Sequence, residues 1–312
     1  MILFCDFNPK IVRSYKSLNF RAHQLNEFIE SRIYASGNGI DSLIFLNNLG
    51  EKAELLTCLG GVNGKLIKEE LDKQFEDFKY VKLKDNNEEL VLIKSINLVT
   101  RLKSKKNLKT LEEAEKFYSL YSEEIKDKSV VALSCIDEDL DEIGYNSFID
   151  LCYKNNTRVI VACDDLDKIK NSKPYLLIIN KSDLEDYTKL IIKTQDETLK
   201  AASVLLNKGI GSLIINSELG SLFINKSSIF RIDFSDLDKT ITKFNPNLML
   251  AAMAFSINRS YDIKTSIKIA VASYIIENYT KFRDVNMAEI KKLMNNIDIK
   301  EIKWETKWKI LN

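Results

Sequence analysis

The sequence is short of residues that several kinds of catalytic site require. Of its 312 residues, one is histidine, three are proline and ten are glycine. With His23 as the sole histidine, we expect neither a histidine-based catalytic triad nor a histidine-rich metal site. The cysteines include no Cys-x-x-Cys pair. Zinc and Ser-His-Asp chemistry are therefore excluded.

The chain also lacks an excess of charge and a long apolar run. Lysine and arginine number 46 against 45 aspartates and glutamates, so the net charge of +1 gives no field that would attract nucleic acid or an anionic membrane. No apolar run reaches the roughly 18 residues of a membrane span, and the N-terminus does not read as a signal peptide. We expect a soluble, cytoplasmic protein that binds neither nucleic acid nor membrane.

The cysteines are odd in number, widely spread and mostly embedded in apolar runs. This placement is typical of reduced thiols in the core of a cytosolic protein. The residues are Cys5, Cys58, Cys135, Cys152 and Cys163.

Short apolar runs alternate with segments of helical period along most of the chain, and 45% of the residues are hydrophobic. Strands are predicted at 2–6, 54–59, 130–134, 158–163, 175–179 and 212–216. Helices are predicted between them, at about 39–49, 64–74, 110–124, 142–154 and 194–208. The alternation indicates a single α/β domain over 1–312, with a central, mainly parallel sheet flanked by helices.

Other segments depart from this alternation. Residues about 10–35 and 86–101 read as β-rich excursions without helices, which favours a small β lid beside the main sheet. After 216, two short strands at 222–225 and 229–232 precede three helices, at about 247–258, 262–280 and 286–296.

Several motifs, in their order, carry a family resemblance. Residues 59–64 read Leu-Gly-Gly-Val-Asn-Gly and open an amphipathic helix; Asn8-Pro9 follows the first strand. Residues 36–41 read Ser-Gly-Asn-Gly-Ile-Asp, and the strand at 175–179 leads into a helix through an Asn-x-x-Asp pattern. The chain resembles the ribokinase/PfkB carbohydrate kinases, nearest the branch of 1-phosphofructokinases and tagatose-6-phosphate kinases.

The resemblance implies a fold and an activity. It implies a ribokinase-like fold whose β lid often forms a homodimer. It also implies transfer of the γ-phosphoryl group of ATP, with Mg²⁺, to a hydroxyl of a sugar or sugar phosphate.

The catalytic motif of the family is altered in this chain. Where relatives carry Gly-Ala-Gly-Asp at a helix start, this chain reads Phe244-Asn245-Pro246-Asn247. Pro246 has no N–H to hold phosphoryl charge, and the amide of Asn247, at the position of the family base, cannot accept a proton as a carboxylate does. Asn245 as N-cap with Pro246 at the first helical position also reads as an ordinary helix start.

The sugar-binding motifs are altered as well. Val12 stands where the compared branch has an Asp that holds sugar hydroxyls. In the segment that the resemblance assigns to the substrate, Gly37, Asn38, Gly39 and Asp41, the family lysine is absent and a carboxylate replaces an amide. Asp41 would repel a phosphorylated sugar and accept hydrogen bonds from a neutral one. The alternative is a plain turn followed by a first-turn acid that favours the helix dipole.

The nucleotide motifs are better kept. Asn180 and Asp183 have the spacing of the family Asn-x-x-Glu that organises Mg²⁺ and phosphate, and Gly220 matches a glycine near the nucleotide. The alternative is a helix cap with a first-turn acid.

Three further segments are assigned more briefly. The turn at 134–138 has lost a family Ser-Gly-Ser-Leu-Pro pattern, and the basic run at 101–109 reads as a solvated connector. Trp304 and Trp308 are four residues apart and would share one helical face.

The sequence therefore predicts a carbohydrate-kinase fold with impaired phosphoryl transfer. The alternative is an active kinase with a displaced base, and a third reading is a structural partner subunit. Nearby carboxylates that could serve as the base are Asp41, Asp183, Asp236 and Asp238.

Overall fold

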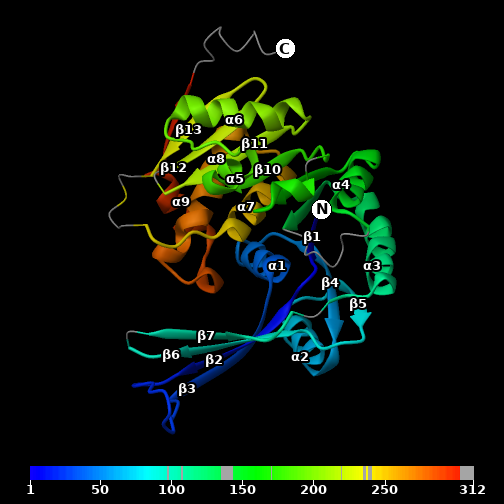
Figure 1. Ribbon diagram of the computed structural model, residues 1–312, viewed down its shortest axis with the longest axis vertical. Helices are drawn as coiled ribbons and strands as arrows, with labels where there is room; N and C mark the ends of the chain where they lie inside the picture. Colours follow the sequence, from blue (N-terminus) through cyan, green and yellow to red (C-terminus); the bar gives the residue numbers. More distant parts are fainter. Residues whose placement is uncertain are drawn as a thin grey trace.

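The computed structural model shows a three-layer α/β body with a flap of strands at one end (Figure 1). It describes residues 1–96, 98–106, 108–134, 143–169, 171–218, 220–234, 237 and 241–302. Cys135, Asp236, Asp238, Trp304, Trp308 and most of the 134–138 turn lie outside these ranges. None of the helices within them is long and apolar enough to cross a membrane.

The body is built on a sheet of ten strands. Seven neighbouring strands are parallel, in the order β11-β10-β9-β8-β1-β4-β5, and β12, β13 and β14 extend the β11 edge in antiparallel fashion. Their bounds are β1 Ile2–Asp6, β4 Ala53–Gly60, β5 Phe78–Leu83, β8 Val130–Ser134, β9 Arg158–Ala162, β10 Leu176–Asn180, β11 Ser212–Ser217, β12 Gly220–Asn225, β13 Ile229–Asp233 and β14 Asp298–Glu301.

Nine α-helices in the described ranges cover the two faces of this sheet. Alternate strand residues point to opposite faces, so each face has its own apolar core. One face packs against α1 Asn38–Asn48, α2 Gly61–Asp72, α7 Pro246–Asn258, α8 Ile263–Ile275 and α9 Met287–Met294. The other packs against α3 Leu111–Glu124, α4 Tyr145–Lys154, α5 Lys181–Thr188 and α6 Gln195–Asn207.

The predicted α/β fold is confirmed, with two strands added at the edges. β5 and β14 were not predicted, because each carries lysines or acids between its apolar residues and neither shows a clear apolar run. Charged residues are typical of sheet edges, where they oppose pairing with another chain. The described cysteines, Cys5, Cys58, Cys152 and Cys163, are buried thiols that form no disulfide within the described ranges.

The flap is the predicted β lid: its four strands lie in the two segments for which the lid is predicted. They pair in the order β3-β2-β6-β7, with bounds β2 Lys10–Lys16, β3 Glu30–Ser36, β6 Glu88–Lys94 and β7 Val99–Lys103. Figure 1 shows them as a separate layer below the body. β2 and β3 continue the chain between β1 and α1, so the lid begins at the edge of the main sheet where the parallel strands end.

One asparagine joins the lid to the body. The Asn87 side chain accepts a hydrogen bond from Gly60 N at 2.7 Å and donates to Cys58 O at 3.0 Å and Pro9 O at 3.2 Å. A Cβ on Gly60 would lie 2.0 Å from Asp85 O, so only glycine admits this approach. The Gly-Gly-x-x-Gly motif therefore has a structural role where the lid joins the body.

We predict that Asn87→Ala lowers the free energy of unfolding by about 1–3 kcal/mol, because it leaves buried backbone groups without hydrogen bonds. Chemical denaturation measures the change. Asn207→Ala, at the exposed end of α6, is the control and should change stability by less than about 0.5 kcal/mol. Equal changes in the free energy of unfolding for the two substitutions would contradict the role of Asn87 in joining the lid to the body.

Candidate carbohydrate and nucleotide site

The first turn of α7 has no free backbone donor for a phosphoryl group. Asn245 is the N-cap, and its side-chain oxygen accepts hydrogen bonds from Asn247 N at 3.1 Å and Leu248 N at 3.3 Å. Pro246 has no N–H, and the backbone N–H of Asn245 donates to Tyr274 O at 2.8 Å. The four donors that a helix start usually leaves open are thus either absent or used within the chain.

The Asn245 cap is itself held in place. Its Nδ2 donates to Glu277 Oε2 at 2.8 Å, and its backbone N–H donates to Tyr274 O at 2.8 Å. Phe244 packs on Tyr274, with ring centroids 5.1 Å apart. The segment 244–247 therefore has the geometry of the ordinary helix start that its sequence allowed.

Backbone N–H groups in the first turn of α1 also donate hydrogen bonds to a side chain of the same chain. Asp6, at the end of β1, accepts hydrogen bonds through Oδ2 from Gly39 N at 3.0 Å and Ile40 N at 3.1 Å. A Cβ on Gly37 would lie 2.1 Å from the same oxygen, so the glycine makes room for this carboxylate. Burial raises the pKa of Asp6, and the hydrogen bonds from these amides oppose the rise.

The structure brings the two altered motifs together. Asn247 Nδ2 donates to Asn38 Oδ1 at 2.9 Å, although 209 residues separate them. Ser42 Oγ, one turn along α1, lies 3.2 Å from Asn247 O. Asn247, at the predicted base position, therefore contacts the predicted substrate segment at the start of α1.

Asp41 has an unusual environment. Its Oδ2 accepts a hydrogen bond from Ser36 Oγ at 3.0 Å, whereas its Oδ1 is buried without a hydrogen-bond partner and lies 3.7 Å from Arg283 Nη2. Burial raises the pKa of Asp41 to about 7; Arg283 and Ser36 limit the rise, Asp6 adds to it and Lys10 opposes it. Asp41 is thus an acid in the first turn of α1, as its alternative reading predicts, and its carboxylate also contacts Ser36 and Arg283.

The other residues of the substrate segment are placed as follows. Val12 is buried in β2 and offers no polar group. Asn8 Oδ1 accepts a hydrogen bond from Lys109 Nζ at 2.5 Å, so the half-buried end of the mostly exposed 101–109 run contacts this segment. The start of the same run, Arg101–Lys103, belongs to β7.

A cavity of about 580 Å³ lies beside the start of α7. Phe244, Pro246 and Tyr274 form one side of it, and residues at the carboxyl ends of β10 and β11 form the other. Those residues are Asn180, Lys181, Ser182, Asn216, Ser217 and Glu218. Ligands of open α/β sheets bind outside the carboxyl ends of the strands, which is where this cavity lies.

Asp183 is near this cavity and already has hydrogen bonds. Its Oδ2 accepts from Asn180 N at 2.8 Å, and its Oδ1 accepts from Ser182 Oγ at 3.2 Å. Burial raises the pKa of Asp183, and the nearby Asp164 adds to the rise. Two acids at neighbouring strand ends fit Mg²⁺ that keeps waters and binds phosphate. Within the described ranges, no three His, Cys, Asp or Glu side chains form a metal cluster.

Gly220 lines a different cavity from Asn180. It belongs to a space of about 300 Å³ that opens between the β11–β13 strand ends and the start of α6. Lys181 and Ser217 line both cavities, so they join the two spaces around the end of β11.

Comparison with known proteins places the chain in a family. The model of the pfkB family carbohydrate kinases matches residues 9–234. The chain belongs to this family. It is 24% identical over 314 residues to a 1-phosphofructokinase of Borreliella burgdorferi, covering 97% of this chain and 99% of that protein.

Solved structures of phosphofructokinases have the same fold. A mutant of phosphofructokinase-2 from Escherichia coli matches with a TM-score of 0.80 at 14% identity, over 94% of this chain and 98% of the other. The same enzyme in complex with fructose-6-phosphate matches with a TM-score of 0.77 at 14% identity and the same coverage. The expected ribokinase-like architecture is thereby confirmed.

Sequence reasoning did not find several residues of this site. Asp6, Asp164, Tyr274 and Arg283 belong to no motif, and each acts through contacts with residues far away in the chain. Asp6 and Asp164 each offered one signal, an acid at or just after the end of an apolar strand. The others had none.

We predict that Asp41→Asn changes the pH dependence of stability. The wild-type folded state binds the Asp41 proton more tightly than the unfolded chain, so this stabilisation is present at low pH and is lost as pH rises to about 7. The free energy of unfolding, variant minus wild type, should rise by about 1–3 kcal/mol from pH 5 to pH 8. Denaturation at both pH values measures it; a constant difference would contradict the raised pKa.

Proposed function

We propose that this chain binds a carbohydrate and a nucleotide at the carboxyl edge of its sheet and is impaired in phosphoryl transfer. The hydrogen-bonded start of α7 carries this proposal, because Asn245 occupies the amides that would hold a phosphoryl group. Each lost donor of such a site typically costs ~10²–10³ in rate.

The missing base supports the same conclusion. Asn247 stands at the family base position, and its amide donates to Asn38 instead of accepting a proton from a substrate hydroxyl. Loss of general-base catalysis typically costs ~10²–10⁴ in rate.

Mg-ATP is the proposed ligand of the larger cavity. Lys181 lines it and could meet phosphate charge, and the rings of Phe244 and Tyr274 offer apolar contact for a base. Asp183 and Asp164 are the residues that would hold Mg²⁺ through its waters. Bound Mg²⁺ would neutralise phosphate charge.

The proposed carbohydrate ligand is a neutral sugar and not a sugar phosphate. Asp6 is buried and Asp41 is half-buried near the start of α1, and Asp6 already accepts hydrogen bonds from the backbone amides of Gly39 and Ile40. Lys10 and Arg283 lie close enough to offset part of this negative charge. Carboxylates favour hydroxyl donors and oppose phosphate.

A homodimer through the lid belongs to this proposal. The lid exposes large apolar side chains that a second copy could cover. They include Leu18, Phe28, Ile33, Val99 and Leu102.

A second candidate is an active kinase in which Asp41 is the base. One observation favours it: the pKa of Asp41 is raised to about 7, where a general base works best at neutral pH, and its Oδ1 has no hydrogen bond. In this case the substrate hydroxyl would approach Oδ1 and not Asn247.

We predict slow or absent turnover in a coupled assay of ADP release with Mg-ATP and D-fructose, fructose 1-phosphate or tagatose 6-phosphate. The rate should be at least ~10²-fold below the ~1–100 s⁻¹ of ordinary kinases.

Restoring the family motif with Phe244→Gly, Asn245→Ala, Pro246→Gly and Asn247→Asp should give little activity in the same assay, because the sugar segment is altered too.

The same assay separates the candidates. Turnover by the wild type at an ordinary kinase rate would overturn the proposal that phosphoryl transfer is impaired. Loss of that turnover in Asp41→Asn would then support the second candidate, in which Asp41 is the base. Thermal stabilisation by Mg-ATP would exclude a structural subunit that binds no ligand, because a ligand of the native state must stabilise it.

A further inference from the structure

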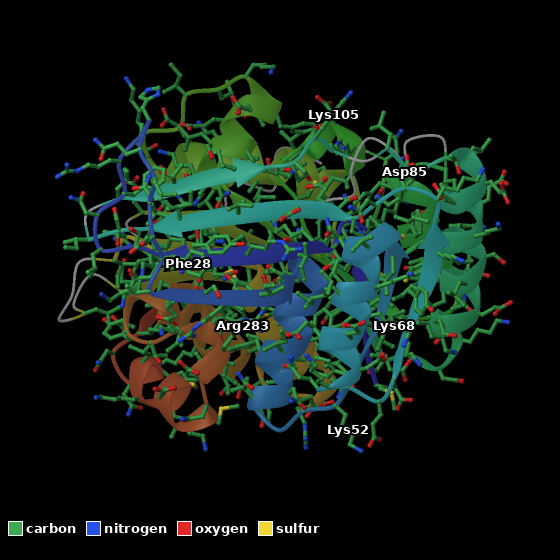
Figure 2. All side chains as sticks on the ribbon, turned by 90° about the horizontal axis from the view of Figure 1, so that it is seen from below. Phe28, Lys52, Lys68, Asp85, Lys105 and Arg283 are labelled. Atoms are coloured by element: carbon green, nitrogen blue, oxygen red, sulfur yellow. The ribbon has the colours of Figure 1, made fainter. Side chains whose placement is uncertain are left out.

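Arg283 joins parts of the molecule that are far apart in the sequence. It lies in the short 3₁₀ turn Phe282–Asp284, between α8 and α9. Its Nη2 donates to Ala35 O in lid strand β3 at 2.8 Å and lies 3.7 Å from Asp41 Oδ1 in α1. Figure 2 labels it at the junction of the lid strands and the C-terminal helices.

The contacts of Arg283 hold its guanidinium in one place. The guanidinium carbon is 4.8 Å from the ring centroid of Tyr34 and 5.2 Å from that of Phe282. Its backbone carbonyl accepts a hydrogen bond from Asn48 Nδ2, in α1, at 2.8 Å. The side chain is 30% exposed, so these contacts are only partly screened by water.

The pair with Asp41 is loose and leaves one buried carboxylate oxygen without a hydrogen bond. At 3.7 Å, the Arg283–Asp41 approach is an ion pair without a hydrogen bond, and Asp41 Oδ1 has no other partner. The opposite oxygen is fixed by Ser36, the last residue of β3. The carboxylate is therefore oriented by the lid root on one side and by Arg283 on the other.

We propose that Arg283 is a positioning residue that fixes the root of the lid and the Asp41 carboxylate as one unit. This inference rests on the proposed function, in which the start of α1 binds the carbohydrate. A sugar hydroxyl that donates to Oδ1 would give this oxygen its missing hydrogen bond, while the hydrogen bond of Arg283 to Ala35 O keeps β3 in place. The C-terminal helices thereby take part in binding at a site far from them in the sequence.

Arginine suits this position better than lysine. Its guanidinium lies over the Tyr34 ring while Nη2 donates to Ala35 O and lies near Asp41. A lysine would keep the charge but could not make the stacked and hydrogen-bonded contacts together.

The test compares Arg283→Gln and Arg283→Lys with the wild type by hydrogen exchange of the unliganded protein. Amide exchange in β3 should rise at least about tenfold in Arg283→Gln and less in Arg283→Lys. Arg259→Gln is the matched control, because Arg259 pairs with Glu51 at 2.6 Å, away from the lid. Unchanged exchange in both Arg283 variants, or an equal rise in the control, would overturn the proposal.

Calorimetric titration with D-fructose separates this inference from the proposed function. If the wild type binds D-fructose, Arg283→Lys should weaken binding about tenfold and Arg259→Gln should not. Equal affinity in wild type and Arg283→Lys would overturn the positioning role. If the wild type binds no D-fructose, that carbohydrate assignment fails, and β3 exchange still decides whether Arg283 fixes the lid root.

Discussion

The architecture of this site depends on how helix starts at the carboxyl edge of the sheet satisfy their N–H groups. Each start leaves up to four donors, which must be met by a ligand, by water or by the chain. Here the chain itself meets those of α7, which Asn245 caps, and Asp6 accepts hydrogen bonds from two of those of α1, Gly39 N and Ile40 N. The amides that could hold a phosphoryl group during its transfer thus donate to side chains of the chain itself, whereas the cavity beside α7 is open to a ligand.

Much of the fold was predictable because it depends on local patterns. The strands at 2–6 and 130–134 have the predicted bounds, since both are apolar runs buried on two faces of a parallel sheet. The lid was predictable from two stretches without helical period. Residues that join distant segments were not: Asn87 joins the lid to the body, and Arg283 reaches β3 across 248 residues. Such contacts leave no periodicity or spacing in a single sequence.

The motifs gave a mixed account of the site. The substitutions at 244–247 predicted an ordinary helix start, and the structure has one. The charge of the substrate segment was only partly predictable, because Asp6 adds a buried acid, whereas Arg283 and Lys10 add positive charge. Gly-Gly-x-x-Gly, the strongest motif of the resemblance, reflects the close packing against Gly60 where the lid joins the body. A motif can therefore persist for a structural reason even where the chemistry is altered.

The most direct test of the central claim is amide NMR of Asn247 and Leu248 during titration with Mg-ATP. If Asn245 keeps these two N–H groups, their proton chemical shifts should stay nearly constant while resonances of residues that line the larger cavity, such as Lys181 and Ser217, change. Saturable downfield shifts of both amides would show that phosphate replaces Asn245, and would contradict the account of an internally closed phosphoryl site.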